Sequence, residues 1–422
     1  MFARRARPLA CVITTFSLAS LHATAFADSD GDRDRDRSRD RTVTVDCASG
    51  DTISRALTKG DERKSLTILI SGTCSESVTI NRSDIKLAAA APGATVSGPD
   101  PAADTIRVTG SRVTIDGITV TGGRNGITGD GAAGLIVQNA VVQGSGRNGI
   151  TFAHGGSGIV DNVTVTNNAR DGVAMDASYA SVINSTVSQN ARHGVGVFNN
   201  GSARIGLNNA NDPAGNVIAT NGFAGIHIVF GSTALIAMNQ IIGNGTSSDP
   251  NAIKIGINLA SGSADIIGGN TISGNVGTGV NLVRSSAIFS DPNFPGITTV
   301  NTISDNGNPT SQGGVSAFLG SSVTIRDAII TGNVGFGVSL SLNSAAQIGS
   351  TTIRNNIATV PGTGHGIQLQ LGSGLLGQTP AGSVTGNAGF GLICFDGESS
   401  MANTGPLGIG ANTLGSVSCT GF

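Results

Sequence analysis

The chain has 422 residues, of which 63 are glycine, one is tyrosine, none is tryptophan and only 12% are charged. Its formal net charge of −2 at pH 7 excludes the strongly basic balance of a nucleic-acid-binding protein. Length alone allows two or three domains, but the glycine content favours a fold of short strands and many tight bends.

Residues 1–27 have a basic start, an apolar centre and the small-residue ending Ala25-Phe26-Ala27. This pattern predicts a secretory signal peptide cleaved after Ala27, and it is too short and interrupted to span a membrane. No later apolar run reaches membrane length. The composition indicates a bacterial protein, so we expect it in the periplasm or outside the cell.

Residues 28–41 are rich in alternating acidic and basic side chains and contain no apolar side chain. Such a segment cannot bury a core, and we expect a disordered charged linker. Asp28, Asp30 and Asp32 are weakly similar to a calcium-binding loop, although the closing glutamate is absent. Calcium is therefore a candidate cofactor, and the sequence shows no cluster of metal-binding His or Cys.

Residues 42–104 are predicted to form an N-terminal cap and the first coils. A short strand at Thr42–Val45 precedes a helix at Asp51–Lys59, in which Asp51 is the expected cap. Ile53, Ala56 and Leu57 share one face of that helix. The helix would cover the exposed backbone edge at the open end of the first coil.

A motif of glycine, apolar residue, any residue and apolar residue recurs through residues 105–422. Its glycines are 22 or 23 residues apart in the first four copies, and insertions lengthen some later intervals. Each period holds short apolar–polar alternations, which predict strands, and no segment is long enough for a crossover helix. The repeat predicts a parallel β-helix of about thirteen coils, with three strands in each coil. The repeat glycines are Gly126, Gly149, Gly172, Gly194, Gly225, Gly256, Gly279, Gly314, Gly337, Gly366 and Gly391.

A column of asparagines precedes these glycines, at a bend where some insertions also fall. Asparagine at a bend tolerates left-handed backbone angles and forms local hydrogen bonds, and the stacked amides can also pair from coil to coil. The column comprises Asn168, Asn190, Asn221, Asn244, Asn275, Asn306, Asn333, Asn356 and Asn387.

Four of the five cysteines lie beyond the signal peptide, at Cys47, Cys74, Cys394 and Cys419. The separations of 27 and 25 residues within the two pairs are each about one coil. Partners on neighbouring coils fall within disulfide distance, so we predict the disulfides Cys47–Cys74 and Cys394–Cys419, one near each end of the repeat.

The repeat resembles the right-handed parallel β-helix proteins of the pectate-lyase-like superfamily over most of Thr42–Phe422. The resemblance implies a single all-β, right-handed parallel β-helix with a short N-terminal capping helix. The stretch Gly72–Ile80 is similar to the opening coil of pectin methylesterases, with Cys74 in place of an aromatic residue. Of the polygalacturonase motifs only Gly364-His365-Gly366 is present, so the family's catalytic carboxylates are missing.

The charged residues of the repeat concentrate in a few coils. Arg124, Arg147, Arg170 and Arg192 each lie two residues before a repeat glycine. The alternation of apolar residues directs this column outward, where a row of guanidinium groups suits the carboxylates of an extended polymer. The neighbouring glycines would leave room for the ligand beside the row. Structural pairing of the arginines with Asp130, Asp171 and Asp176 is the alternative.

We predict a site at these coils. The candidate catalytic residues are Arg170, Asp171, Asp176 and His193, with Arg170 better suited to clamp a carboxylate than to act as a base. The candidate ligand-binding residues are Arg124, Arg147, Arg192, Lys254, His227 and Tyr179.

Three functions are compatible with the sequence. The superfamily resemblance implies a secreted protein that binds or processes an extended polysaccharide, with a uronate-rich polymer as the candidate ligand and lyase or glycoside hydrolase chemistry as the candidate activity. The missing catalytic motifs favour a non-catalytic surface or adhesion protein instead, and a purely structural repeat is the third. We expect a monomer with a polysaccharide partner, without nucleic acid or a membrane span.

Overall fold

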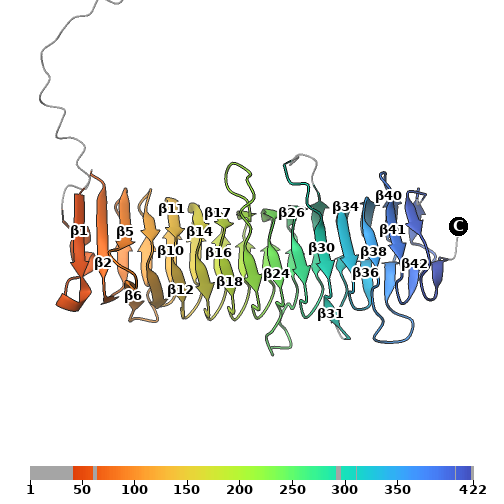
Figure 1. Cartoon of the computed structure of the whole chain (residues 1–422), viewed down its shortest axis with the longest axis horizontal. Coiled ribbons are helices and arrows are strands. Elements are labelled where there is room, and N and C mark those ends of the chain that lie inside the picture. Colours follow the sequence, from red (N-terminus) through yellow and green to blue (C-terminus); the bar gives the residue numbers. More distant parts are fainter. Residues whose placement is uncertain (1–40, 60–63, 291–295, 310, 404, 420–422) are drawn as a thin grey trace, which may run out of the picture. The chain divides into compact units, whose positions relative to one another are not determined.

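The computed structural model describes residues 41–59, 64–290, 296–309, 311–403 and 405–419, which form a stack of parallel coils (Figure 1). The predicted signal peptide and nearly all of the charged linker lie outside the described residues. Each coil adds one strand to each of three parallel sheets. The predicted all-β, parallel β-helix fold is therefore confirmed.

The three sheets, called here A, B and C, follow one another around each coil. Sheet A consists of β1 (Arg41–Asp46), β2 (Leu66–Ser71), β5 (Ile85–Ala89), β8 (Thr114–Asp116), β11 (Ala133–Gln138), β14 (Ser157–Asp161), β17 (Tyr179–Ile183), β20 (Ser202–Ile205), β23 (Thr233–Ala237), β26 (Ser263–Gly268), β29 (Ser286–Phe289), β34 (Ser322–Arg326), β37 (Ala345–Gly349), β40 (Gly374–Gly377) and β43 (Ser400–Ala402).

Sheet B consists of β3 (Thr73–Ser75), β6 (Thr95–Gly98), β9 (Thr119–Gly122), β12 (Val141–Gln143), β15 (Thr164–Thr166), β18 (Thr186–Ser188), β21 (Val217–Ala219), β24 (Gln240–Ile242), β27 (Thr271–Ser273), β30 (Asn301–Ser304), β35 (Ala328–Thr331), β38 (Thr352–Arg354), β41 (Gly382–Thr385) and β44 (Leu407–Ile409). A small antiparallel pair, β31 (Gly307–Asn308) and β32 (Ser311–Gln312), lies in an insertion after β30.

Sheet C contains the repeat motif. It consists of β4 (Val78–Ile80), β7 (Ile106–Val108), β10 (Ile127–Asp130), β13 (Ile150–Ala153), β16 (Val173–Asp176), β19 (Val195–Phe198), β22 (Ile226–Val229), β25 (Ile257–Ala260), β28 (Val280–Val283), β33 (Val315–Phe318), β36 (Phe336–Leu340), β39 (His365–Leu369), β42 (Phe390–Cys394) and β45 (Gly415–Ser418).

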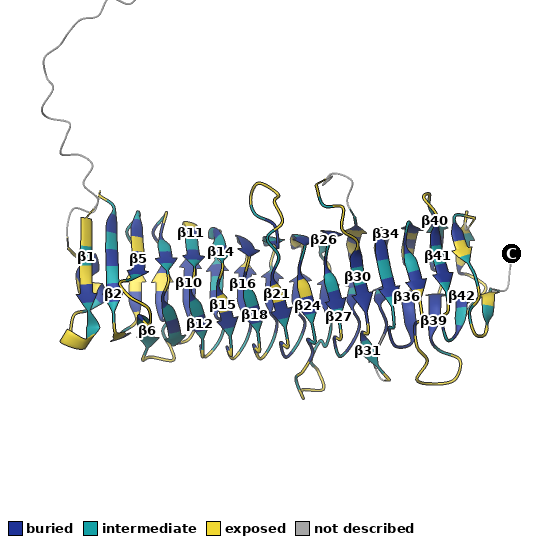
Figure 2. Cartoon of the chain, viewed as in Figure 1, coloured by how far each residue is buried: buried dark blue, intermediate teal, exposed yellow. Residues whose placement is uncertain are grey.

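Sheet A has 15 strands and sheets B and C have 14 each, slightly more than the coil number expected from the motif. The first two strands of sheet C follow Ser77 and Thr105 and lack the repeat glycine, so the motif does not mark the earliest coils. Along each strand of sheet C, alternate side chains enter the core: Ile150 and Phe152 are fully buried, whereas Thr151 between them faces outward. Buried positions consequently run along the whole stack (Figure 2).

The predicted asparagine column forms a continuous buried ladder at the bend between sheets B and C. Each side-chain amide from Asn168 to Asn387 donates to the amide oxygen of the next asparagine at 2.8–3.2 Å, and the ladder ends at Asn412. The ladder asparagines themselves do not adopt left-handed angles. The preceding residues adopt them instead, as at Asn167 with φ 55° and Gln189 with φ 56°.

The repeat glycines serve packing between coils and do not leave room for a ligand. A Cβ on Gly172 would lie 2.7 Å from the side-chain nitrogen of Asn190 and 2.7 Å from the carbonyl oxygen of Gly194. Any side chain there would push apart the ladder and the next coil. The expectation that these glycines admit a ligand is therefore wrong.

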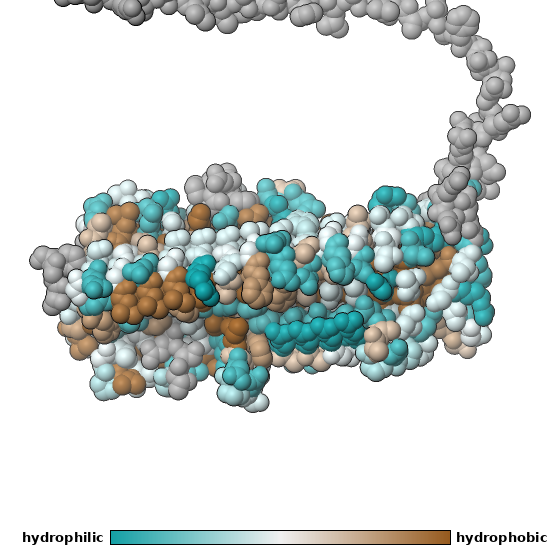
Figure 3. All heavy atoms as spheres, turned by 180° about the vertical axis from the view of Figure 1, so that it is seen from behind, coloured by the Kyte–Doolittle hydropathy of each residue, from teal (hydrophilic) through white to brown (hydrophobic). Residues whose placement is uncertain are grey.

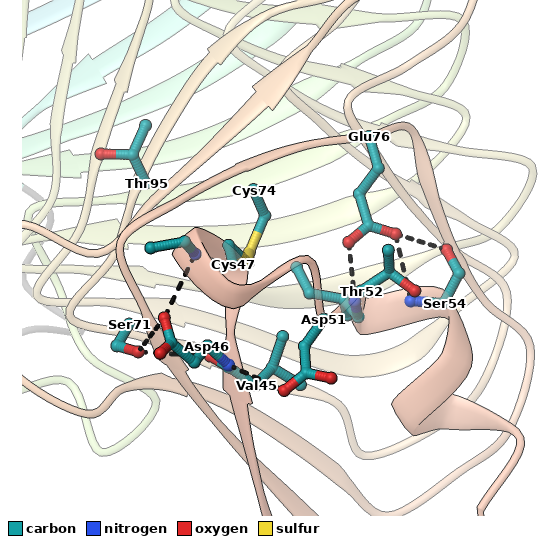
Figure 4. Close-up of a disulfide and its surroundings, with 12 residues drawn as sticks. Val45, Asp46, Cys47, Asp51, Thr52, Ser54, Ser71, Cys74, Glu76 and Thr95 are labelled. Carbon is teal, nitrogen blue, oxygen red and sulfur yellow. Dashed lines mark hydrogen bonds between the residues drawn. A yellow bond between two sulfur atoms is a disulfide. The ribbon is translucent and has the colours of Figure 1, made fainter.

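The N-terminal end is closed by the short 3-10 helix η1 (Cys47–Ser49) and the helix α1 (Ile53–Leu57). Thr52, and not Asp51, caps α1 by accepting from the backbone N–H of Arg55. The carboxylate of Glu76 accepts from the backbone N–H groups of Ile53 and Ser54 at 2.6 and 3.1 Å (Figure 4). The coil motif Gly72–Ile80 thus anchors the helix.

Both predicted disulfides are confirmed. Cys47 and Cys74 join η1 to β3 with their Cα atoms 5.1 Å apart (Figure 4). Cys394 and Cys419 join the last two coils with a Cα separation of 4.6 Å. Each disulfide therefore ties together chain segments at one end of the stack.

Candidate functional site

The four arginines of the predicted row lie in register on successive coils. The backbone N–H of Arg147 donates to the carbonyl of Arg124 at 2.6 Å, that of Arg170 to Arg147 at 2.9 Å, and that of Arg192 to Arg170 at 3.0 Å. Arg124 is exposed and the other three are partly exposed. Burial, followed by the positive charges of the neighbouring Arg192 and Arg147, lowers the pKa of Arg170. The row is thus a line of closely spaced positive charges.

None of these four arginines forms an ion pair in the part of the chain that the structure describes. Asp130 pairs with other residues, as detailed below, and the carboxylate of Asp176 accepts from Asn199 at 2.7 Å. Arg192 lies over the ring of Phe223, 5.6 Å from its centroid. Asp130 and Asp176 therefore do not neutralise the row, whereas the buried carboxyl group of Asp171 interacts electrostatically with Arg147, Arg170 and Arg192 without forming an ion pair.

Arg124, Arg147 and Arg170 form one wall of a groove of about 480 Å³ along sheet C. Its floor is made of small outward residues of β10, β13 and β16, namely Thr128, Thr151 and Ala174. The stack surface carries a strongly hydrophilic band along the coil axis and hydrophobic patches toward the C-terminal coils (Figure 3). An extended ligand lying along the axis would meet one arginine in each coil.

The opposite wall follows the bend between sheets C and A. Its members are Asp130, His154, Asp176, Asn199 and, at one end, Phe198 and Phe230. Asp130 bonds to His154 and Arg107, and these contacts lower the pKa of its carboxyl group. Phe230 is 66% exposed. The groove therefore offers cations on one side, and carboxylates, an imidazole and aromatic rings on the other.

Asp171 and His193 belong to a buried hydrogen-bond column behind the arginine row. The side-chain oxygen of Asp171 accepts from the backbone N–H of His193 at 3.1 Å, and Nδ1 of His193 accepts from Ala224 at 3.2 Å. Burial raises the pKa of Asp171. His193 has no exposed surface, so its side chain does not reach a ligand in the groove.

His193 stacks on His227, with ring centroids 4.0 Å apart and an interplanar angle of 3°. Burial, followed by the charge of Arg192, lowers the pKa of His227 to about 4. Burial also lowers the pKa of His193 well below its usual value. The pair is therefore neutral at pH 7 and supports the end of the groove from within.

Two predicted ligand contacts lie away from the groove. Tyr179 begins β17 in sheet A, and its hydroxyl group donates to Asn209 at 3.0 Å. Lys254 lines a separate surface hollow together with Pro250 and Asn258. The structure thus brings together five of the predicted residues around the groove: Arg124, Arg147, Arg170, Asp176 and, largely buried behind the row, Asp171.

Sequence reasoning missed His154, Arg107 and the two phenylalanines. Asp130 and Asp176 both lie four residues after a repeat glycine, and Phe198 holds the same place. This shared position, four residues after a repeat glycine, was the feature of the sequence that could have predicted the second wall of the groove. His154 falls one position later, on the outside of the bend, and no repeated feature marks it.

No group of three or more His, Cys, Asp or Glu side chains within the described ranges could hold a metal ion. The weak calcium-like loop at residues 28–32 lies outside those ranges. Among the described residues, no helix has the length and apolarity needed to cross a membrane.

The chain matches the family described as right handed beta helix region over residues 67–211 and 176–296, together more than half of its length. No curated protein sequence matches it. Among solved structures it is similar to the pectate lyase Pel9A, with 17% identity, a TM-score of 0.43, and coverage of 69% of this chain and 78% of that chain.

The chain is similar to two other solved structures at comparable identities and TM-scores. The periplasmic alginate epimerase AlgG shares 12% identity with a TM-score of 0.44, covering 89% of this chain and 83% of that one. The Dettilon tailspike protein gp208 shares 13% identity with a TM-score of 0.43, covering 88% and 68%. Identities this low do not transfer an activity, which has to be argued from the groove itself.

Proposed function

The chain belongs to the right-handed β-helix family, and from the groove on this scaffold we propose that it binds an extended, carboxylate-bearing polysaccharide. The observation that supports this is the arginine row. Three in-register guanidinium groups line an open groove without an ion-pair partner among the described residues.

Electrostatics favours an anionic ligand at this row. Two unit charges about 5 Å apart in water repel by about 0.8 kcal/mol, and more where burial lowers the dielectric. A ligand with a carboxylate opposite each arginine would remove this repulsion and gain charge-assisted hydrogen bonds. Since the row follows the coil axis, a linear polymer fits it better than a compact anion.

Hydroxyl-rich sugar rings would also match the remaining groove surface. Polar groups of Thr128, Asn148 and Thr151 line the floor beside the arginines, and Phe198 and Phe230 offer apolar faces at one end. We propose a uronate polymer on this basis. The two disulfides favour an oxidising location, so we propose the periplasm or the exterior as the place of action.

The test is binding of homopolymers of galacturonate, mannuronate and guluronate to the wild type and to Arg147→Ala/Arg170→Ala. We expect the double variant to bind at least about tenfold more weakly at low salt, because it loses two charge-assisted contacts. The difference should shrink as salt screens the charges. Parallel measurements with and without calcium test the candidate cofactor.

Arg354→Ala is the matched control, since Arg354 is exposed on β38 in sheet B and lies outside the groove. Lys86→Ala is less suitable because Lys86 pairs with Asp116 at 2.9 Å. Equal affinity of the wild type, the double variant and the control would contradict the proposal.

A further inference from the structure

A row of three exposed leucines follows the bend between sheets C and A in the C-terminal coils. Leu319, Leu342 and Leu371 come shortly after strands β33, β36 and β39, and they are 41%, 38% and 52% exposed. The backbone N–H of Gly320 donates to the carbonyl of Leu342 at 2.9 Å, and that of Asn343 donates to the carbonyl of Leu371 at 2.9 Å. The three leucines, called here the leucine row, therefore lie in register on successive coils.

The backbone at the leucine row disfavours leucine. All three residues are left-handed, with φ between 53° and 57°, a conformation that glycine and asparagine adopt more easily. An earlier coil has such a residue at the same position, Asn199 with φ 54°. The chain thus keeps large apolar side chains where both the backbone and the surrounding water oppose them, which indicates a contact surface.

Opposite charges lie at the two ends of the leucine row, at the same position of the bend. Arg284 lies one coil before the row, is exposed, and forms no ion pair among the described residues. Asp396 lies one coil after it and is partly exposed. Its carboxylate accepts from the backbone N–H groups of Leu371 and of Ser399. Along the coil axis the column is therefore one cation, three leucines and one carboxylate.

This column is complementary to a second copy of itself that runs in the opposite direction. With Leu342 on a twofold axis, Arg284 of each copy would face Asp396 of the other. Leu319 of each copy would face Leu371 of the other. Two columns that run in the same direction would instead place like charges opposite each other. We propose that the protein forms an antiparallel homodimer through this column, in place of the monomer expected from the sequence.

The residues beside the leucine row leave room for the leucines of a second copy. Gly320 follows Leu319 and Gly372 follows Leu371, and a Cβ added at Gly320 would meet nothing within 4 Å. Phe395, on the last of these coils, is 54% exposed and extends the apolar surface. A surface of this kind is smaller than the roughly 800 Å² per partner of a standard interface. We therefore expect a weak dimer, with a Kd on the order of 10–100 μM.

The dimer would leave both arginine grooves open. Only three strands of sheet C follow β36 near the axis, whereas the groove strand β16 lies six strands before it. The two rods would therefore overlap at their C-terminal coils, and the grooves would lie at opposite ends of the pair. Two sites on one particle would raise the apparent affinity for a polymer long enough to reach both. Dimerisation itself needs no ligand in the groove.

Sedimentation velocity of the full chain tests this proposal, over concentrations from about 1 to about 300 μM. We expect a reversible monomer–dimer equilibrium. Leu342→Asn should weaken the dimer at least about tenfold, because it removes the apolar contact at the axis. Its melting temperature should be equal or slightly higher, since asparagine suits the left-handed backbone. A monomer at every concentration, or unchanged association of Leu342→Asn, would overturn the proposal.

Charge reversal tests the contacts at the two ends of the row. Arg284→Asp should weaken the dimer about tenfold at low salt, because two carboxylates then face each other at both ends. Arg354→Asp is the matched control, with the same change of charge on β38 in sheet B. It should leave the dimer unchanged, and equal effects of the two variants would argue against the facing charges.

Mixing variants tests the direction of the two columns. Arg284→Asp and Asp396→Arg should each associate weakly alone, whereas one copy of each restores opposite charges at both ends of the pair. A mixture that associates no better than the separate variants, both with melting temperatures near that of the wild type, contradicts the antiparallel arrangement.

A cysteine at the axis gives a second test, which does not alter the bonds of Asp396. Leu342→Cys should form a disulfide-linked dimer, because this residue meets its own copy at the axis. Leu319→Cys should not, since it lies two coil steps, about 10 Å, from its own copy, which is beyond disulfide distance. Equal cross-linking of the two variants would overturn the proposed register.

Discussion

At the scale of single residues, the end of the groove rests on two buried histidines, His193 and His227, whose charged forms burial disfavours. His227 lies under Phe198, with ring centroids 5.8 Å apart, and its Nδ1 is 3.0 Å from the side-chain nitrogen of Asn258. His193 and Arg192 surround it on the other side. Burial disfavours the charged imidazole of His227, and the positive charge of Arg192 disfavours it further, which is why its pKa is lowered.

This gives a prediction for stability against pH. The pKa of His227 falls from 6.5 to about 4 on folding, so between these values the unfolded chain binds a proton that the folded chain does not. Stability should therefore fall as pH drops through this window, by roughly 3 kcal/mol for this group. His227→Asn, which continues the column of Asn258 and Asn281, should lose less. Urea unfolding at pH 7 and about pH 4 measures this, and parallel losses in both proteins would refute it.

At the scale of elements, the asparagine ladder fixes the bend between sheets B and C from Asn168 onward, in coils that include those of Arg170 and Arg192. Asn275 illustrates its bonding. It accepts from the backbone and side-chain nitrogens of Asn244 at 2.9 and 3.0 Å, and it donates to Asn306 and to the carbonyl of Ile241 at 2.9 and 3.0 Å. The bend can be regular in every coil because these bonds satisfy its buried polar groups.

Removing one amide from the middle of the ladder should destabilise the protein strongly. Asn275→Ala leaves buried partners on both neighbouring coils unpaired, each at about 1–3 kcal/mol. We expect about 3–5 kcal/mol less unfolding free energy, measured by urea denaturation. Asn412→Ala is the control at the end of the ladder, where the residue is only partly buried. It should cost clearly less, and equal losses would argue against the ladder as a continuous element.

The asparagine ladder and the arginine row were predictable from the sequence because the same residue type recurs at the same position of successive coils. Features that occur only once were not predictable. Asp176 and Tyr179 are three residues apart, yet they lie on sheets C and A because the chain turns between them at Ala177, with φ 47°. Proximity in sequence therefore grouped Tyr179 with the groove incorrectly. His154 was not predicted because no other charged residue lies near it in the sequence. It meets Asp130 only across neighbouring coils.

At the scale of the whole coil stack, the two ends differ. The helix α1 covers the N-terminal end, where Ile53 is fully buried. At the C-terminal end Leu414 and Val417 remain 47% and 48% exposed. Coils bond only to their neighbours, so opening should begin where the last coil has a single neighbour. The disulfide Cys394–Cys419 holds that coil in place.

We therefore expect unequal effects from removing the two disulfides. Cys394→Ser/Cys419→Ser should speed amide hydrogen exchange in β43, β44 and β45 and leave the groove strands β10, β13 and β16 protected. A closed loop of this size contributes about 3 kcal/mol. Cys47→Ser/Cys74→Ser should open its end less, because Glu76 still holds α1. Faster exchange throughout the stack in the first variant would contradict a local role.

The register of the arginine row has a consequence for evolution as well as for binding. Since each 22- or 23-residue unit delivers one arginine to the same line, duplication of a unit would lengthen the charged track by one position without redesigning any loop. Loss of a unit would shorten it. If the row binds a polymer as proposed, the length of polymer in contact with it would follow the number of repeat units, which genetic slippage can change in single steps.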